Sequence, residues 1–290
     1  MTTAPNQAAA PSLPTPLVSA QQLIAARASG LVPVIVDCGF DLADTAAGER
    51  AFAQGHVAGA VHAHLDRDLA GTKTGRNGRH PLPARADFAA TLGRLGIAPD
   101  RHVVVYDAQG GMYAARLWWM LRWVGHRAVS VLDGGLQAWK DAGGAIEDGD
   151  ARVVAAAPYP VAESLVRTVD ADALLESLGR VALLDARAGE RFRGEVEPLD
   201  ARAGHIPGAR SRFFKDNLDA TGRFRPASEL RAAFDAFGAA PEQVVHQCGS
   251  GVTACHNLLA MEIAGLPGSA LYPGSWSEWS SDPSRPVAVG

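Results

Sequence analysis

The sequence predicts an α/β protein made of two homologous domains, each with a parallel β-sheet flanked by helices. The chain has 290 residues, which suits two domains of ordinary size. Short apolar runs alternate with helical patterns in both halves, as in sheets whose strands are connected by helices. Short sequences of the first half also recur, in the same order, in the second half.

The recurring sequences are the strongest sign of a duplication, because chance similarity would not keep their order. Three matched pairs are Val34–Asp37 with Ala182–Asp185, Gly55–Ala60 with Gly204–Ala209, and Gly134–Trp139 with Gly274–Trp279.

Apolar runs in matching places predict the strands. The expected strands are Val32–Cys38, Val103–Asp107, Val129–Leu132, Val181–Asp185, Gln243–Gln247 and Ala270–Tyr272. Helices are expected over Met112–Val124 and Ala254–Ile263. Ligands of such sheets bind beyond the carboxyl ends of the strands, so the residues that follow each strand are the candidates for a site.

The expected organisation has four parts. Residues 1–16, rich in Ala, Pro and Thr, are expected to be a disordered tail, and residues 17–147 the first domain. A linker is expected over 148–166, where Ala-Pro-Tyr-Pro breaks regular structure, and the second domain over 167–290.

Composition excludes several classes of protein. Lys and Arg number 27 against 31 Asp and Glu, a net charge of -4, so no general affinity for nucleic acid is expected. No apolar run reaches the roughly 18 residues of a membrane span. The Trp-rich run around Leu117–Val124, which holds Trp118, Trp119 and Trp123, predicts core or domain-interface packing.

Three cysteines, Cys38, Cys248 and Cys255, cannot form a disulfide framework and indicate free thiols in a reducing compartment. The first Lys or Arg is Arg27, whereas targeting sequences need basic residues early. We therefore expect a cytoplasmic protein.

Cys248 directly follows an expected strand and precedes Gly249, Ser250, Gly251, Val252 and Thr253 and then a helix. Backbone N–H groups of such a loop converge on the side chain at its start, and the helix N-terminus adds positive potential. This position predicts a lowered pKa for the Cys248 thiol and a functional role. The alternative is a buried structural cysteine, the commonest fate of a free thiol.

Four sequences together resemble the tandem-domain rhodaneses, sulfurtransferases of the thiosulfate and 3-mercaptopyruvate type, from Leu17 to Trp279. They are Arg191–Gly194 with the acidic residues behind it, Gly204–Ala209, Cys248–Thr253 and Gly274–Trp279. The resemblance implies two rhodanese-like domains and a reaction in which Cys248 takes a sulfane sulfur from a donor, holds it as a persulfide and passes it to an acceptor.

The resemblance also implies the substrate-binding residues. Arg191 matches the arginine that anchors the donor's negative charge, although Arg193 could share that role, and the residues Gly249 to Thr253 form the loop around the sulfur. Arg202 is the candidate for a second substrate-binding arginine. Gly249 and Ser250 are neutral where thiosulfate enzymes have cations, so 3-mercaptopyruvate is the expected donor and thiosulfate the alternative.

In the mercaptopyruvate branch, an acid, a histidine and a serine form a relay across the domain interface. Ser250 matches the serine and His56 is the candidate histidine, with Asp44 or Glu49 as the acid. Alternatively, His56 only fixes its own loop through a backbone hydrogen bond, which is the role expected of His205 in the second half.

The first half is expected to be catalytically silent, because Asp107 stands where the second half has Cys248 and a carboxylate cannot carry sulfane sulfur. Arg116 is expected either to pair with Asp107 or to be solvated. Cys38 and Cys255 are expected in the core.

No cofactor or metal is implied, and His62 and His64 lack further ligands nearby. The acceptor is expected to be cyanide or a thiol, including thioredoxin. A phosphatase on the same fold needs an arginine where this chain has Ala254. A sulfur carrier or regulatory module without turnover is the alternative of another class.

Overall fold

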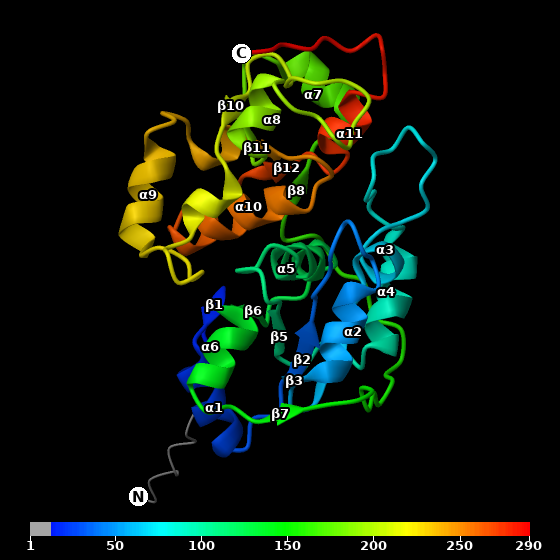
Figure 1. The fold of residues 1–290 in the computed structure, drawn as a ribbon, viewed down its shortest axis with the longest axis vertical. Coiled ribbons are helices and arrows are strands. Elements are labelled where there is room, and N and C mark those ends of the chain that lie inside the picture. Colours follow the sequence, from blue (N-terminus) through cyan, green and yellow to red (C-terminus); the bar gives the residue numbers. More distant parts are fainter. Residues whose placement is uncertain (1–12) are drawn as a thin grey trace, which may run out of the picture.

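The computed structural model describes residues 13–290. They form two halves that follow one another along the chain and meet at helix α5 (Figure 1). Each half contains a five-stranded sheet in which all neighbouring strands are parallel.

The first half runs from β1 to β7. Its elements are β1 (Leu17–Val18), α1 (Ala20–Ala28), β2 (Val34–Asp37), α2 (Ala47–Gln54), β3 (His56–Val57), β4 (Ala60–His62), α3 (Leu65–Asp68), α4 (Arg85–Arg94), β5 (Val103–Tyr106), α5 (Ala114–Trp123), β6 (Val129–Leu132), α6 (Gly135–Asp141) and β7 (Ile146–Glu147).

The second half runs from β8 to α11. Its elements are β8 (Arg167–Thr168), α7 (Ala171–Ser177), β9 (Ala182–Asp185), α8 (Gly189–Arg193), β10 (Arg210–Ser211), the 3-10 helix η1 (Phe214–Asn217), α9 (Ala227–Asp235), the 3-10 helix η2 (Pro241–Gln243), β11 (Val244–Gln247), α10 (Thr253–Ile263), β12 (Ala270–Leu271) and α11 (Ser275–Trp279).

The two sheets have the same strand order, which confirms the duplication. The order is β1-β6-β5-β2-β4 in the first half and, read in the same direction, β8-β12-β11-β9-β10 in the second. The central strands β5 and β11 are buried along their whole length, as expected of a parallel sheet covered on both faces. The two loops that follow these strands therefore occupy matching places in the two halves.

All six predicted strands and both predicted helices are present, with ends that differ by at most two residues. The short edge strands β1, β4, β8 and β10 were not predicted, because two or three residues carry no periodic pattern. Residues 1–12 of the tail expected over 1–16 lie outside the described residues. The prediction is wrong for 13–16: Leu13 is buried, and the carbonyl of Pro16 accepts a hydrogen bond from the amide of Val131 in β6.

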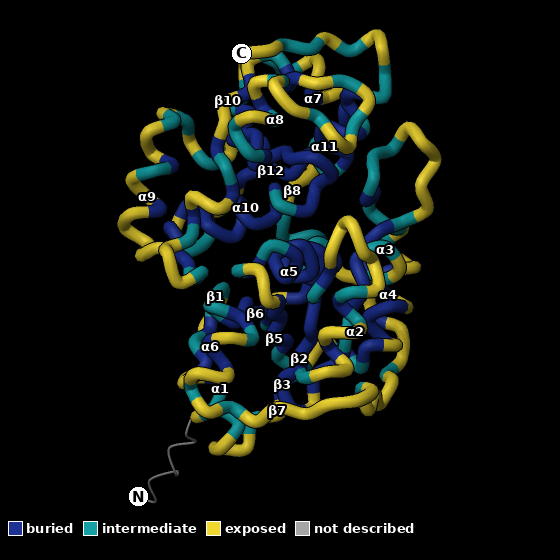
Figure 2. The backbone as a smooth tube through the Cα atoms, viewed as in Figure 1, coloured by how far each residue is buried: buried dark blue, intermediate teal, exposed yellow. Residues whose placement is uncertain are grey.

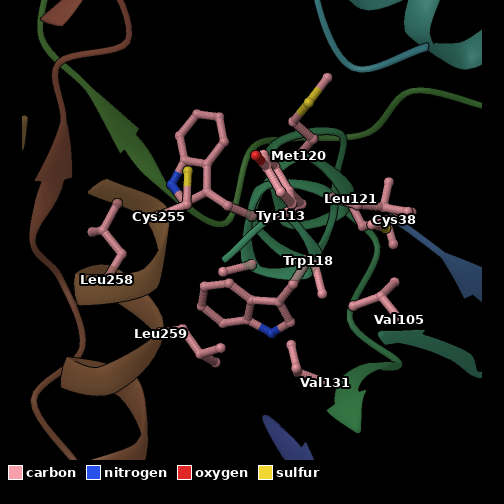
Figure 3. Close-up of a cluster of buried hydrophobic side chains, with 14 of the residues drawn as sticks. Cys38, Val105, Tyr113, Trp118, Met120, Leu121, Val131, Cys255, Leu258 and Leu259 are labelled. Atoms are coloured by element: carbon pink, nitrogen blue, oxygen red, sulfur yellow. The ribbon is translucent and has the colours of Figure 1, made fainter. Parts of the chain in front are cut away.

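The interface between the halves is a continuous apolar core built around α5 and α10. Figure 2 shows α5 as a buried segment between the two halves. Trp118 and Trp119 are almost fully buried, which confirms their predicted packing role. In Figure 3, Cys255 and Leu259 of α10 face α5 and Trp118. Because the core crosses the interface, the two halves hold each other in a fixed orientation.

The segment 148–166 crosses the surface of the first half in extended form before β8 begins. Its backbone donates to carbonyls of α4 and of the end of α5, including the bond from Tyr159 to Ala89, and the Tyr159 ring is buried. Among residues 13–290, no helix is long and apolar enough to cross a bilayer.

Candidate active site

A cavity of about 290 Å³ lies between the two halves, beyond the carboxyl ends of β9 and β11. The second half supplies Cys248 and its loop, and the first half supplies the opposite wall, including Arg79, His80 and Tyr113. Neither half alone encloses this space. The predicted loop residues Gly249, Ser250, Val252 and Thr253 also line it.

The Cys248 loop joins β11 to α10 and is fixed from behind by the segment that leads into α11. The amide of Cys248 donates to Ser275 Oγ at 3.1 Å, and its carbonyl accepts from the Trp276 amide at 2.9 Å. Gly251 has φ +75°, and a Cβ there would lie 2.2 Å from the Pro273 carbonyl oxygen, so this position requires glycine. These contacts explain why the Gly274–Trp279 sequence accompanies the Cys248 loop.

The matching loop of the first half shows what this loop geometry binds. The carboxylate of Asp107 accepts four backbone N–H groups of its own loop, from Gln109, Gly111, Tyr113 and Ala114, at 2.8–2.9 Å. It does not pair with Arg116, so that expectation is wrong. In the second half, within residues 13–290, the amides of 249–252 donate to no other group. The strand-to-helix loop of the first half thus forms a cradle for an anion, and the Cys248 loop occupies the matching place in the second half.

Two arginines meet over the loop at Gly249. A Cβ built on Gly249 would lie 2.8 Å from Arg79 Nη2 and 3.5 Å from Arg191 Nη1. Arg191, on α8, donates to Glu197 at 2.7 Å and to Asp200 at 3.1 Å, and Arg79 pairs with the same Asp200. Burial raises the pKa of the Asp200 carboxyl, while the Arg79 bond acts in the opposite direction. Both guanidinium groups line the cavity beside the Cys248 loop, and the carboxylates of Glu197 and Asp200 balance their charges from behind.

Arg202, the predicted second substrate-binding arginine, does not line this cavity, whereas Arg79 does. The Arg202 guanidinium donates instead to four carbonyl oxygens between Trp279 and Arg285, which fixes the chain after α11. Arg79 lies in the long loop between α3 and α4, which Figure 1 shows in cyan reaching from the first half toward α11. The Arg79 amide donates to Ser277 Oγ of α11 at 3.0 Å.

The histidine that meets Ser250 is His80. Its Nδ1 lies 2.7 Å from Ser250 Oγ, and its Nε2 lies 3.5 Å from Asp66 Oδ1. Burial lowers the pKa of His80 to about 3, and Asp66 acts in the opposite direction without reversing the shift. The imidazole is therefore neutral at physiological pH. With the proton on Nε2 facing Asp66, Nδ1 accepts the hydroxyl proton of Ser250.

The prediction of His56 is wrong, because its ring has a structural role. It stacks on Phe52 at 3.7 Å between ring centroids, and its Nδ1 lies 2.8 Å from the Phe52 carbonyl oxygen. His205 makes the same contacts with Phe192 in the second half, at 3.9 Å and 2.9 Å. The shared Gly-His pair of the repeat thus holds a turn in both halves, as the alternative interpretation held.

The acids considered for His56 also lie elsewhere. Asp44 pairs with Arg50 and Glu49 with Arg67, both at the surface. Sequence reasoning missed Asp66, Arg79 and His80, which belong to a stretch without a counterpart among the recognised repeats. The sequence offered one signal, the two adjacent basic residue types Arg79 and His80 in a loop next to Pro81.

The other cysteines lie in the core, as predicted. Burial raises the pKa of the Cys38 thiol, and it raises that of Cys255 to about 12. The Cys255 thiol donates to the Gly251 carbonyl at 3.3 Å. Among the three cysteines only Cys248 lines the cavity.

The fold and the site define a duplicated α/β protein with one cysteine loop at a cleft between its halves. The family of rhodanese-like domains matches twice, at residues 19–142 and 169–282. The chain therefore belongs to the rhodanese family, among its two-domain sulfurtransferases.

Relatives cover most of the chain. It is 48% identical over 280 residues to a Pseudomonas aeruginosa protein described as "Probable 3-mercaptopyruvate sulfurtransferase", covering 94% of this chain and 98% of that one. A thiosulfate sulfurtransferase of Cricetulus griseus is 40% identical and covers 68% of this chain and 69% of its own. The solved 3-mercaptopyruvate sulfurtransferase from Leishmania major superposes with a TM-score of 0.82 at 32% identity, over 93% of this chain and 76% of the other.

Proposed function

We propose that this protein transfers a sulfane sulfur from 3-mercaptopyruvate to a thiophilic acceptor, with Cys248 as the nucleophile. The observation that carries the proposal is the 2.7 Å contact between Ser250 and His80, on the loop that begins at Cys248 and inside the same cavity. In 3-mercaptopyruvate the sulfur leaves a carbon atom, and that carbon must then receive a proton. The contact between Ser250 and His80 offers a path for this proton. The 48% identity to a relative described as a mercaptopyruvate enzyme supports the same donor.

The first half-reaction moves one sulfur. The Cys248 thiolate attacks the donor sulfur, and the sulfur–carbon bond breaks with its electron pair on carbon, as the enolate of pyruvate. Ser250 relays the proton of the donor thiol to the enolate carbon, and His80 Nδ1 accepts a hydrogen bond from the Ser250 hydroxyl and orients it. The products are pyruvate and an anionic Cys248 persulfide, with all atoms and charges balanced.

The surrounding groups match the charges of this step. Arg79 and Arg191 are placed to bind the donor carboxylate, since a guanidinium binds a carboxylate through two parallel hydrogen bonds. The backbone N–H groups of 249–252 are placed to donate hydrogen bonds to the outer persulfide sulfur, as the N–H groups of the matching loop donate to the Asp107 carboxylate. Asp66 keeps the His80 proton on Nε2.

In the second half-reaction an acceptor nucleophile, cyanide or a thiol, attacks the outer sulfur. The sulfur–sulfur bond breaks, and its electron pair returns to Cys248. Leu42 and Leu199, both about half exposed, edge the cavity from opposite halves, so an acceptor carried by a protein such as thioredoxin would enter between them. Buried free thiols are consistent with a cytoplasmic location, which stays a prediction.

Thiosulfate is the second candidate donor. It is a dianion, and Arg79 and Arg191 supply two positive charges within reach of Gly249. Its sulfite leaving group needs no proton, so it has no use for the Ser250–His80 pair. The presence of that pair favours mercaptopyruvate.

The test compares kcat/KM for the two donors with one common acceptor, and follows Cys248 by mass spectrometry after donor treatment. We expect a preference for mercaptopyruvate and an added mass of about 32 Da on Cys248, one sulfur atom. A clear thiosulfate preference contradicts the donor. Uptake of one sulfur per chain without turnover would indicate a carrier.

A further inference from the structure

Arg116, on α5 of the first half, is fully buried directly behind the Cys248 loop. Its Nη1 donates to the Gly251 carbonyl of that loop at 3.0 Å. Its Nη2 donates to the carbonyls of Leu69 and His80, at 3.2 and 3.1 Å. One guanidinium thus ties the cysteine loop to the chain segment that carries His80.

No carboxylate within residues 13–290 pairs with Arg116, and its Nε, also buried, has no partner. Burial lowers the pKa of the guanidinium, and the sulfurs of Cys255 and Cys248 act in the opposite direction. An arginine side chain stays protonated even when buried. The positive charge behind the loop is therefore neutralised only by carbonyl dipoles and by whatever charge the nearby sulfurs carry.

The duplication supplies an internal comparison. Arg116 on α5 reaches the loop of the second half, and His256 on α10 reaches the loop of the first half. His256 Nε2 lies 3.0 Å from the carbonyl oxygen of Gly110, in the silent loop of the other half. Each helix thus contacts the loop of the opposite half in the same way.

The two contacts differ in charge. Burial lowers the pKa of His256 to about 4, so the silent loop receives a neutral ring. The silent loop already holds the carboxylate of Asp107, whereas the loop that begins with Cys248 receives a guanidinium. The cation lies only on the side where an anionic sulfur would form.

We infer that Arg116 is a positioning residue for sulfur transfer, which fixes the Cys248 loop through the Gly251 carbonyl and whose unneutralised charge favours the anionic thiolate and persulfide of Cys248. The inference rests on the proposed role of Cys248. It gives the silent half an electrostatic part in the reaction, beyond forming a wall of the cavity. In a buried environment of low dielectric, one charge behind the loop is enough to change the fraction of Cys248 that is thiolate by a measurable amount.

The alternative is a purely structural tie between the halves, and Arg122 provides the matched control. Arg122 also lies on α5 and crosses the same interface, donating to Glu262 of α10 at 2.9 Å. It does not line the cavity. Loss of Arg122 therefore reports what a missing interdomain arginine does to stability alone.

The experiment measures Cys248 alkylation by iodoacetamide, located by mass spectrometry, across pH in the full-length chain. Variants are Arg116→Met, Arg116→Gln, Arg116→Lys and Arg122→Met. The other titratable groups at the guanidinium do not change charge between pH 5 and 9, since the pKa of His80 is about 3 and that of Cys255 about 12. A movement of the profile in that range therefore reports Cys248.

We expect Arg116→Met and Arg116→Gln to slow alkylation at pH 7 by about tenfold and to move the profile to higher pH. Arg116→Lys should recover most of the rate, and Arg122→Met should keep it although its thermal unfolding temperature falls. The Gln variant keeps a donor for Gly251 and serves alone if the Met variant does not fold.

An unchanged profile in the uncharged variants overturns the inference, and so does a Lys variant as slow as Gln. A native protein whose Cys248 takes neither alkyl group nor sulfur instead overturns the proposed function, so the two failures are distinguishable.

Discussion

His80 Nδ1, from the first half, lies 2.7 Å from Ser250 Oγ, from the second half. The contact couples the first half to the loop of Cys248, and it depends on the packing of α5 against α10 at the interface. The site is therefore a property of the two-domain assembly. Each of the following outcomes depends on that arrangement.

Replacement of Cys248 by Ser should abolish sulfur transfer, because a hydroxyl does not form a persulfide. Steady-state turnover with mercaptopyruvate and cyanide measures this. Cys38→Ala and Cys255→Ala are the controls: both side chains are buried away from the cavity, so at least a third of the activity should remain. Retained turnover in Cys248→Ser would show that another group carries the sulfur.

Ser250→Ala and His80→Asn should each lower kcat for mercaptopyruvate by about 100-fold, because both remove the same proton path. The double variant should be no slower than either single variant, since the two residues act as one unit. Thiosulfate turnover should fall much less in all three. His56→Asn is the control and should lower the unfolding temperature without lowering kcat. Equal losses with both donors would contradict the proton-path role.

Arg79→Met should raise KM for the donor by about 10- to 100-fold, the loss of one charged hydrogen-bond partner, or about 1.5–3 kcal/mol. Arg191→Met should act similarly, as its guanidinium meets that of Arg79 over Gly249. Arg202→Met should leave KM unchanged and lower the free energy of unfolding, since Arg202 holds four backbone carbonyls. A KM increase in the Arg202 variant would show that Arg202 binds the donor, as the sequence analysis expected.

Asp107→Ala should destabilise the protein by about 2–4 kcal/mol, because it leaves four buried backbone N–H groups without their acceptor. Asp107→Asn keeps one acceptor oxygen and should lose less. Urea unfolding measures both. Since Asp107 does not line the cavity, kcat should change by less than a factor of about three. A fully stable Ala variant would show that the cradle does not need an anion.

Acid should destabilise the protein through its buried histidines. Burial lowers the pKa of His80 and of His246 to about 3, and of His256 to about 4, from 6.5 in the unfolded chain. Below pH 6.5 the unfolded chain binds protons that the folded one does not, so the free energy of unfolding falls by up to about 1.4 kcal/mol per histidine and pH unit.

His246→Phe provides the check on this acid effect, because His246 does not line the cavity and packs edge-on against Phe234. Between pH 6 and 4.5 the free energy of unfolding should depend less steeply on pH in the variant than in the native protein. The difference in slope should correspond to one bound proton, about 1.4 kcal/mol per pH unit. Above pH 7.5 the two slopes should agree. An identical slope at acid pH would mean that His246 is protonated in the folded state.

Much of the architecture could be predicted because local sequence patterns determine it. The strands Val129–Leu132 and Val103–Tyr106 are uninterrupted apolar runs, and the Cys248 loop combines a strand end, small residues and a helix start. His56 and Arg202, which the structure places away from the Cys248 cavity, were predicted from residue type and approximate spacing. Neither criterion contains information on which side chain faces which cavity.

The amino-acid sequence alone determined the duplication, the central strands and the place of Cys248 in a strand-to-helix loop, since these follow from repeats and short-range periodicity. Only the tertiary structure decided that Arg79, His80 and Arg116 of the first half lie against the loop of Cys248, with Asp66 next to His80. The partners of Arg79, His80 and Arg116 in the second half lie over a hundred residues away in the chain, and no local preference encodes such contacts. They arise when the apolar faces of α5 and α10 bury each other and bring the two loops together.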